Sequence, residues 1–403
     1  MIGTRRLQGA LPPFTQPKDR KSFPLSPKSA TINKTIFLCR KRDMMKNKKS
    51  LIILMAVLFL AILAGCNSKG KTEDAKINKE PYSDQQSLLG TYVQVRIYDD
   101  GKEEVLEKAF ARVKELGDKI TVNEKGSEID EINEQAGIKP VKVSDDIYPL
   151  LKRAYEYSED SSGGFDMAIG PITQLWRIGF DDARKPSQEE IDQALKLVDY
   201  HKVKLNDEDK TVYLEEKGMQ LDLGAIAKGF ITDEVVKVLK DNGVTTAIVD
   251  LGGNVYVLGH SPRGKDMDWN VGIQDPNKAR NTVIGTVQES NKTLVTSGIY
   301  ERFLEVDGKK YHHLFDPKTG YPFDNDIAGV TVITNKSIDG DGLSTAVFSM
   351  GVKKGLEYAE GLKDVDVIFV TKEDQVYVSK DIESVFELGK DSGYTMGDRK
   401  DLK

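Results

Sequence analysis

One stretch near the middle of the chain, Leu221-Asp-Leu-Gly-Ala-Ile-Ala-Lys-Gly229, most constrains the fold because strand-like sequence gives way to helix-like sequence there. Residues 211–214 (Thr-Val-Tyr-Leu) favour a strand, whereas residues 229–240 carry apolar side chains at helical spacing. The start of a helix offers unpaired N–H groups and the positive end of the helix dipole, which suit phosphate. We therefore interpret the stretch as a turn where Lys228 meets an anion and Asp222 accepts a ribose-type hydroxyl. An ordinary strand-to-helix turn with a solvated lysine is the alternative.

The first 65 residues have the pattern of a leader. A short basic segment at 44–50 is followed by an unbroken apolar run, Leu51–Leu63, and by Leu63-Ala-Gly-Cys66. The apolar run is shorter than a membrane-spanning helix, so we interpret 44–65 as a signal peptide. The ending resembles the lipobox of bacterial lipoproteins, which predicts that Cys66 is lipidated and becomes the new N-terminus. A plain signal peptide with a chance cysteine is the alternative.

Residues 1–43 precede what looks like a complete signal peptide, so we expect a mis-annotated start or a disordered leader there. Residues 1–65 carry 13 Lys and Arg against two Asp, a net charge of +11. Because the whole chain has a net charge of −6, the remainder carries −17. Such an acidic body argues against binding to nucleic acid, and against membrane binding other than through a lipid.

Downstream of Cys66, residues 66–84 are polar and rich in Lys and Glu, which predicts a flexible tether. Residues 85–395 mix strand-like and helix-like segments without a regular alternation. This mixture favours a mixed α/β (α+β) fold over a doubly wound one. We expect a strand from Leu88, helices beginning after Ser127, Ser144 and Ser187, and a hairpin at 203–214.

Two further segments are rich in glycine and acidic residues. Ser162-Gly-Gly-Phe-Asp-Met-Ala-Ile-Gly-Pro171 is suited to a rigid loop that forms a wall for a flat ring. Taken alone, this segment is better explained as a tight turn with Phe165 in the core. Asp250-Leu-Gly-Gly-Asn254 is a glycine-rich strand end and is a weak signal by itself.

Two of the four histidines, His312 and His313, precede the turn Asp316-Pro-Lys-Thr-Gly320. A histidine at a strand end can act as a general base or as a phosphate ligand, although most histidines are structural. Asp341 and Thr345 lie four residues apart in a helical segment and share one face. Carboxylate and hydroxyl oxygens suit Mg²⁺, whereas an aspartate that caps the helix is the simpler explanation.

In combination, these segments resemble the ApbE family of FAD:protein FMN transferases, formerly labelled thiamine biosynthesis lipoproteins. The resemblance covers about residues 85–390. The motifs occur in the family's order: Leu89-Gly-Thr, Ser127-Glu-Ile-(x3)-Asn133, Gly164-Phe-Asp-(x4)-Pro171, Asp222-Leu-Gly-Ala-Ile-Ala-Lys-Gly229, Asp250-x-Gly-Gly-Asn254, His313-x-x-Asp-Pro-x-Thr-Gly320 and Asp341-x-x-Ser-Thr345.

The resemblance implies one domain of two lobes with FAD in the cleft between them. Carried over residue by residue, it places the flavin and nucleotide against Leu89, Gly164, Phe165, Asp166, Asp222 and Lys228. It also implies that the backbone oxygen of Ala225 holds Mg²⁺ together with the side chains of Asp341 and Thr345. His313 is placed beside the pyrophosphate.

The implied reaction is attack by a Thr or Ser hydroxyl of an extracytoplasmic acceptor protein on the FMN phosphorus of FAD, with release of AMP. His313 is our candidate for the general base because an ordinary imidazole is suitably basic near neutral pH; Asp341 is the alternative. Mg²⁺ and Lys228 would neutralise the developing charge. The resemblance and the leader together predict a lipid-anchored protein on the extracytoplasmic face of the cell membrane.

Asn123 departs from the family pattern, which often has an aromatic residue over the cofactor at this place. A smaller polar side chain leaves room for water, which would make the enzyme a Mg²⁺-dependent FAD pyrophosphatase that releases FMN and AMP. Leu89 replaces a methionine of similar volume. A lipoprotein that binds flavin without catalysis is the third alternative.

Overall fold

The computed structural model describes residues 76–264, 266–279 and 282–402. These residues belong to one compact unit that spans Thr72–Lys403. The predicted leader at 1–43, the signal peptide at 44–65, the lipidation site Cys66 and the first ten residues of the tether lie outside the described residues. Within the part of the chain that is described, no helix is both long enough and apolar enough to span a membrane.

A nine-stranded sheet with the order β1-β2-β6-β7-β10-β13-β14-β15-β17 forms the centre of the unit. Its neighbouring strands pair antiparallel, except that β15 and β17 are parallel. Antiparallel pairing explains why the sequence lacks the regular alternation of a doubly wound fold, and the expected mixed α/β class is confirmed. The strands are β1 (Ile77–Leu88), β2 (Thr91–Asp99), β6 (Ala247–Leu251), β7 (Asn254–Leu258), β10 (Lys292–Gly298), β13 (Ile327–Thr334), β14 (Asp366–Thr371), β15 (Gln375–Val378) and β17 (Thr395–Met396).

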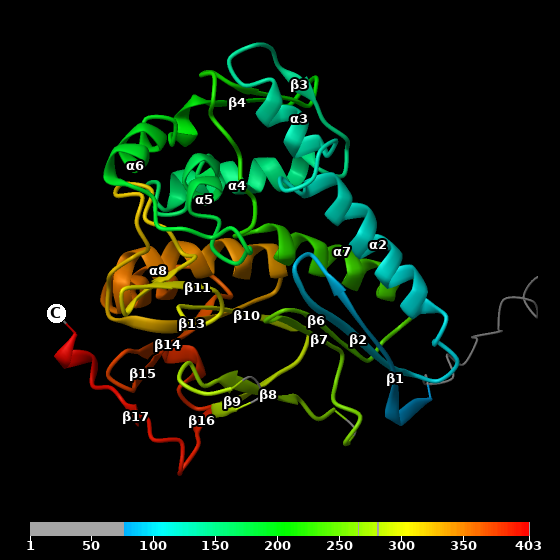
Figure 1. The fold of residues 1–403 in the computed structure, drawn as a ribbon. Helices are drawn as coiled ribbons and strands as arrows, with labels where there is room; N and C mark the ends of the chain where they lie inside the picture. Colours follow the sequence, from blue (N-terminus) through cyan, green and yellow to red (C-terminus); the bar gives the residue numbers. More distant parts are fainter. Residues whose placement is uncertain (1–75, 265, 280–281, 403) are drawn as a thin grey trace, which may run out of the picture. The chain divides into compact units, whose positions relative to one another are not determined.

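Three long helices cover one face of this sheet (Figure 1). They are α2 (Val105–Ile120), α7 (Ala227–Asp241) and α8 (Ser337–Glu360). Each contributes an apolar stripe to the largest core, where strand residues such as Val95 and Val330 are fully buried. Helix α8 is kinked at Gly351, which has a φ of 77°.

Shorter elements lie above these helices in Figure 1. They are α3 (Glu128–Glu134), α4 (Tyr148–Asp160), α5 (Gly170–Trp176), α6 (Gln188–Leu195), the 3₁₀ turn η1 (Tyr200–Lys202) and a small sheet of β3 (Val141–Lys142), β5 (Thr211–Leu214) and β4 (Val203–Asn206). Trp176, which is fully buried, centres a separate aromatic core with Tyr311 and Phe315.

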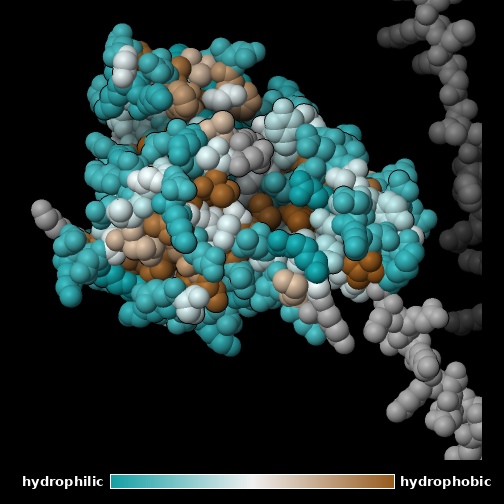
Figure 2. Space-filling model, turned by 90° about the horizontal axis from the view of Figure 1, so that it is seen from below, coloured by the Kyte–Doolittle hydropathy of each residue, from teal (hydrophilic) through white to brown (hydrophobic). Residues whose placement is uncertain are grey.

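A three-stranded sheet packs against the other face of the central sheet through its own apolar cluster. It consists of β16 (Phe386–Leu388), β9 (Val283–Glu289) and β8 (Trp269–Gln274). A view of the molecule from below shows hydrophobic surface as patches within a largely hydrophilic face (Figure 2). The hairpin β11 (Phe303–Val306) and β12 (Lys309–His312) and the 3₁₀ turns η2 (Lys380–Ile382) and η3 (Arg399–Asp401) complete the fold.

Several local predictions can be compared with these elements. Ser127 and Ser187 accept hydrogen bonds from the first-turn N–H groups of α3 and α6, so both caps are confirmed. The predicted cap at Ser144 is wrong, because the N-cap of α4 is Ile147 and no side chain caps it. The 203–214 hairpin is confirmed.

The first hairpin differs from the expectation in two ways. Strand β1 already begins at Ile77, inside the segment expected to be a tether, because it pairs with β2 along its length. The strand expected from Leu88 begins only at Thr91, since Leu89 and Gly90 form the turn, with φ values of 56° and 66°. Two successive positive φ values match a two-residue hairpin turn of the type that follows strand twist.

Candidate functional site

The stretch 221–229 leads into α7, as predicted, and a side chain of α3 binds its first residue. The amide group of Asn133 in α3 accepts a hydrogen bond from the Leu221 N–H at 2.7 Å and donates one to the Leu221 carbonyl at 3.1 Å. Asp222 accepts a hydrogen bond from the Gly224 N–H at 2.8 Å, which shapes the turn before the helix. Asn133 therefore fixes the start of the turn, a role that its place in the family motif did not reveal.

Lys228 and Asp341 meet where α7 and α8 pack together. The Lys228 Nζ lies 3.3 Å from Asp341 Oδ1 and 3.5 Å from the carbonyl oxygen of Gly224. Asp341 is only 3% exposed, and its Oδ2 accepts a hydrogen bond from the Gly229 N–H at 2.8 Å. This first-turn N–H, which we expected to be available to phosphate, is thus already paired with a carboxylate of the neighbouring helix.

The residues that follow Asp341 on α8 differ in their partners. Ser344 is buried, donates to the Asp341 carbonyl at 2.7 Å and bonds to Ser297 of β10 at 2.8 Å. Thr345 is half-buried and lies one turn beyond Asp341 on the same helix. Asp341 therefore lies beside the turn that contains Ala225. Thr345 lies on the same face of α8 as Asp341.

The Gly164–Asp166 segment forms a tight turn with buried side chains. Phe165 is 3% exposed and packs against Tyr157 in the main core. Asp166 is 8% exposed, and its two oxygens accept hydrogen bonds from the N–H groups of Ala168 at 2.7 Å and Tyr200 at 3.3 Å. Burial is the largest cause that raises the pKa of Asp166 to about 6. This geometry matches the simpler explanation, a tight turn with Phe165 in the core.

Helix α5 connects two of the predicted nucleotide-site residues. Its Thr173 donates a hydrogen bond to Asp222 Oδ2 at 2.6 Å. The next residue, Gln174, donates to the side-chain oxygen of Asn123 at 3.4 Å, and Asn123 is otherwise exposed. The backbone of Asp222 also donates to the Met167 carbonyl at 3.0 Å, so the 163–168 turn adjoins the same place.

Arg302 joins the first hairpin to His313. Its guanidinium donates to the Gly90 carbonyl at 3.1 Å, beside Leu89, while its carbonyl lies 3.2 Å from His313 Nδ1. Leu89 itself lies against Gly117 of α2, where an added Cβ would be 2.5 Å from the leucine Cδ2. The hairpin turn and the His313 strand end, far apart in sequence, are thereby brought together.

The surroundings of His313 change the chemistry expected of it. Burial, followed by the positive charges of Arg302 and nearby Lys228, lowers the pKa of His313 to about 3. This pKa lies below the ordinary imidazole value that the sequence-based interpretation assumed, because desolvation and two cations oppose protonation. A neutral imidazole close to Lys228 remains able to accept a hydrogen bond or a proton once an anionic group offsets these charges.

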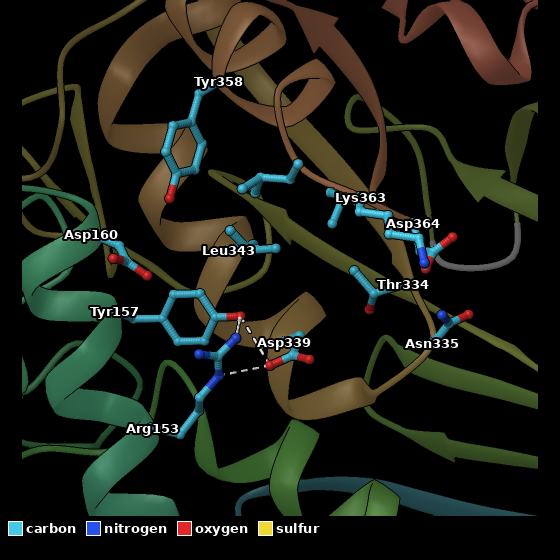
Figure 3. Close-up of a pocket in the computed structure, with 12 residues that line it drawn as sticks. Arg153, Tyr157, Asp160, Thr334, Asn335, Asp339, Leu343, Tyr358, Lys363 and Asp364 are labelled. Atoms are coloured by element: carbon cyan, nitrogen blue, oxygen red, sulfur yellow. Dashed lines mark hydrogen bonds and ion pairs between the residues drawn. The ribbon is translucent and has the colours of Figure 1, made fainter.

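A pocket is present between α4 and α8 (Figure 3). Arg153 and Tyr157 of α4 point to Asp339 of α8, with the Arg153 Nε and Tyr157 hydroxyl 2.8 Å and 3.0 Å from Asp339 Oδ1. None of the predicted flavin or metal residues lines this pocket, so it is not the predicted site. It is lined by Arg153, Tyr157, Asp160, Thr334, Asn335, Asp339, Leu343, Tyr358, Leu362, Lys363, Asp364 and Val365.

In the described residues, no three His, Cys, Asp or Glu side chains gather as a metal-binding group. The predicted metal set contains one carboxylate, Asp341, with one hydroxyl and one backbone oxygen. Sequence reasoning missed the supporting residues Thr173, Arg302 and Asp233, of which Asp233 accepts hydrogen bonds from the Ser337 and Ile338 N–H groups of α8. Each acts on a partner that is distant in sequence or outside the motifs.

Taken together, the fold and the site define a mixed α/β protein with a Lys–Asp pair at a helix–helix junction. The sequence matches the model of the ApbE family over residues 89–369, and the chain belongs to this family. It is 38% identical over 317 residues to a FAD:protein FMN transferase of Klebsiella pneumoniae, covering 79% of this chain and 97% of the relative. A Treponema pallidum protein of the same name is 35% identical and is covered over 96% of its length, against 83% of this chain.

Solved structures agree with this assignment. The ApbE protein of Thermotoga maritima has a TM-score of 0.69 and 29% identity, covering 75% of this chain and 98% of that one. The apo form of the flavinyl transferase ApbE of Pseudomonas stutzeri has a TM-score of 0.66 and 27% identity, covering 78% and 98%. The resemblance inferred from the motifs is confirmed, as is the expectation of an enzyme of a transferase family.

Proposed function

We propose that this protein is a Mg²⁺-dependent FAD:protein FMN transferase. It transfers FMN from FAD to a Thr or Ser hydroxyl of an extracytoplasmic acceptor protein and releases AMP. The relatives' names support the transferase activity and FAD as its substrate. The observation that carries the proposal for this chain is the buried Asp341 carboxylate with the Lys228 ammonium 3.3 Å away.

The residues at this junction fit an oxygen-bound cation. Asp341 Oδ1 lies 3.3 Å from the Lys228 ammonium, so this carboxylate already pairs with a positive charge, and we propose that a metal ion would bind beside it. The Ala225 carbonyl and the Thr345 hydroxyl would complete a set of hard oxygen ligands of the kind that Mg²⁺ prefers. When bound, Mg²⁺ would neutralise charge on the pyrophosphate.

In the proposed reaction, the acceptor hydroxyl oxygen forms a bond to the FMN phosphorus while the bond from that phosphorus to the bridging oxygen breaks. AMP leaves with the bridging oxygen, and FMN remains on the acceptor as a phosphoester. Lys228 would supply a cation for the developing negative charge once its ammonium turns from Asp341 to the phosphates. His313 accepts the hydroxyl proton in our leading assignment, and Asp341 is the alternative base.

For the flavin and nucleotide, we propose Leu89, Asn123, Gly164, Phe165, Asp166, Asp222 and Lys228 as the surrounding residues, in a cleft between two lobes. The links through Thr173, Gln174 and Arg302 support a shared location for these segments. Since Phe165 and Asp166 are buried, we propose that their turn contributes through its backbone and shape. We also propose that the protein is anchored on the extracytoplasmic face by a lipid on Cys66.

Hydrolysis of FAD to FMN and AMP is the second candidate, and one observation favours it. Asn123 is exposed, and its side chain accepts a single hydrogen bond in the described chain, at 3.4 Å from the Gln174 amide. A small, solvated side chain at this position leaves a path for water to the phosphorus. The same residues would then act on water in place of a protein hydroxyl.

The test is mass spectrometry of a threonine-containing acceptor domain after incubation with the protein, FAD and Mg²⁺. Transfer predicts a mass gain equal to FMN minus one water, the increment of a phosphoester-linked FMN, and this gain is absent with His313→Ala. Accumulation of AMP and free FMN with an unmodified acceptor would instead establish the pyrophosphatase. Unchanged FAD would contradict both enzymes and leave a flavin-binding lipoprotein.

A further inference from the structure

Helices α7 and α8 cap each other: a carboxylate of each helix accepts hydrogen bonds from N–H groups in the first turn of the other. Asp341 of α8 accepts the hydrogen bond from the Gly229 N–H of α7 at 2.8 Å. In return, Asp233 of α7 accepts hydrogen bonds from the Ser337 and Ile338 N–H groups of α8 at 2.7 Å and 2.9 Å. Each helix thus supplies an anionic side chain to the N-terminus of the other, where the helix dipole favours negative charge.

The contribution of Asp233 is needed because α8 has no cap of its own. Its N-cap residue is Lys336, whose side chain makes no capping hydrogen bond. A lysine side chain cannot accept a hydrogen bond, and its charge is unfavourable at the positive end of a helix. Asp233 therefore caps α8 from a neighbouring helix, a role that Ser, Thr, Asp or Asn usually fills at the N-cap position of the helix itself.

The junction between the two helices leaves no room for displacement toward each other. A Cβ on Gly229 would overlap the carbonyl oxygen of Ser337 and lie 2.8 Å from the Cβ of Asp341. The first turn of α8 is also anchored to α4 through Asp339, Arg153 and Tyr157 (Figure 3). Asp233 and Asp339 thus hold the helix start from two directions, with Asp341 immediately after them.

We propose that Asp233 is a positioning residue for the active site: by holding the first turn of α8 against α7, it sets the place of the Asp341 carboxylate beside Lys228 and the 224–229 turn. Insofar as Asp341 is a Mg²⁺ ligand, this inference rests on the proposed function. Asp233 contacts neither the predicted ligands nor the predicted nucleotide residues. Its effect passes through the backbone of α8.

The test compares Asp233→Asn with Asp99→Asn. Asp99 is a suitable control because it too is an aspartate whose oxygens accept backbone N–H groups, those of Thr245 and Thr246; it is buried, whereas Asp233 is half-buried, and it lies at the end of β2. The measurements are the Mg²⁺ concentration that gives half-maximal AMP release from FAD, and amide hydrogen exchange of the peptide that contains Gly229. The exchange measurement is made without Mg²⁺ or FAD, so it does not depend on activity.

Asp233→Asn is expected to raise the half-maximal Mg²⁺ concentration about tenfold, as loss of a residue that orients a metal ligand commonly does. It should also speed exchange at Gly229, because Asp341 no longer stays in place to accept that hydrogen bond. Asp99→Asn should lower thermal stability without either change. Asp233→Glu, which retains the charge on a longer side chain, should fall between the wild type and Asp233→Asn, and it serves for the comparison if the Asn variant does not fold.

Wild-type exchange at Gly229 and a wild-type Mg²⁺ requirement in the folded Asp233 variants would overturn the inference. Absence of AMP release and FMN transfer in the wild-type protein would overturn the proposed function alone. In that case, the exchange comparison still decides whether Asp233 positions Asp341.

Discussion

The ammonium of Lys228 lies 3.3 Å from Oδ1 of Asp341, although 113 residues separate them in the chain. The carboxylate is 3% exposed, so this ion pair sits at the edge of the protein interior and not on a freely solvated surface. Removing one partner of such a pair leaves the other with an uncompensated charge. This relationship underlies the first two predictions.

Replacing Asp341 with Asn should reduce AMP release from FAD at least about a hundredfold, because the site loses its one predicted carboxylate ligand. AMP is quantified by chromatography at saturating FAD and Mg²⁺, and circular dichroism verifies that the variant is folded. A folded variant with wild-type turnover would refute the role of Asp341 in the metal site.

Replacing Lys228 with Met should increase the rise in unfolding temperature that Mg²⁺ produces. Without the ammonium, the buried carboxylate has a greater need for another cation, and a ligand that binds only the folded state stabilises it by mass action. Thermal unfolding with and without Mg²⁺ measures the difference. An equal or smaller Mg²⁺ effect than in the wild type would argue that the ammonium and the metal do not share a place.

Replacing Gly229 with Ala should destabilise the fold by about 2 kcal/mol, a typical cost of forcing an added carbon into packed structure. The added Cβ would overlap the Ser337 carbonyl oxygen and push α7 from α8. The control is Gly361→Ala, where the nearest atom would be the Tyr358 oxygen at 3.3 Å. Urea unfolding of both variants gives the comparison, and similar stabilities would contradict the close packing of the two helices.

His312 should make the protein less stable in acid. Its Nε2 lies 3.0 Å from the Phe323 carbonyl and its Nδ1 accepts the Leu314 N–H, an arrangement that suits the neutral ring. Burial is the largest cause that lowers the pKa of His312 from 6.5 to about 4. The unfolded chain therefore binds a proton between about pH 6.5 and 4 that the folded protein does not, and stability falls as the pH drops through this window.

The measurement is the free energy of unfolding of the wild type and of His312→Asn at pH 7 and pH 4.5. The loss on acidification attributable to His312 is up to about 3 kcal/mol, so the variant should lose less than the wild type. Asp166 and Asp233, whose pKa values burial raises to about 6, act in the opposite direction, since their stabilisation is lost as the pH rises from 3.8 to 6. Comparing variant with wild type removes this shared background, and equal acid sensitivity would contradict the assignment to His312.

Replacing Asn123 with Tyr should increase the ratio of FMN transfer to FAD hydrolysis. An aromatic ring at this exposed position would cover the place where water reaches the phosphorus in our interpretation. The ratio of flavinylated acceptor to free FMN, measured in one reaction mixture, reports the change, with Asn123→Ser as the control for a small side chain. An unchanged ratio would remove Asn123 as the reason for hydrolysis.

Local sequence patterns were sufficient to predict much of this protein. The mixed α/β class, the helices that follow Ser127 and Ser187, the hairpin at 203–214 and the family all follow from them. These features depend on periodicity, capping residues and turn residues that act within a few positions of one another. The seven motifs identify the family because they occur along the sequence in the family's order, which can be read without the structure.

Only the tertiary structure decided how these motifs meet. The pairing of Gly229 with Asp341, the cap that Asp233 gives to α8 and the contacts of Arg302 with Gly90 and His313 all join distant segments. Local reasoning expected a free helix N-terminus and a cap at Ser144, and both expectations failed. It also assumed an ordinary imidazole pKa for His313, whereas burial lowers this pKa. Packing brings in charges, burial and hydrogen-bond partners from elsewhere in the chain, and these set the chemistry of a residue that its own sequence neighbours cannot determine.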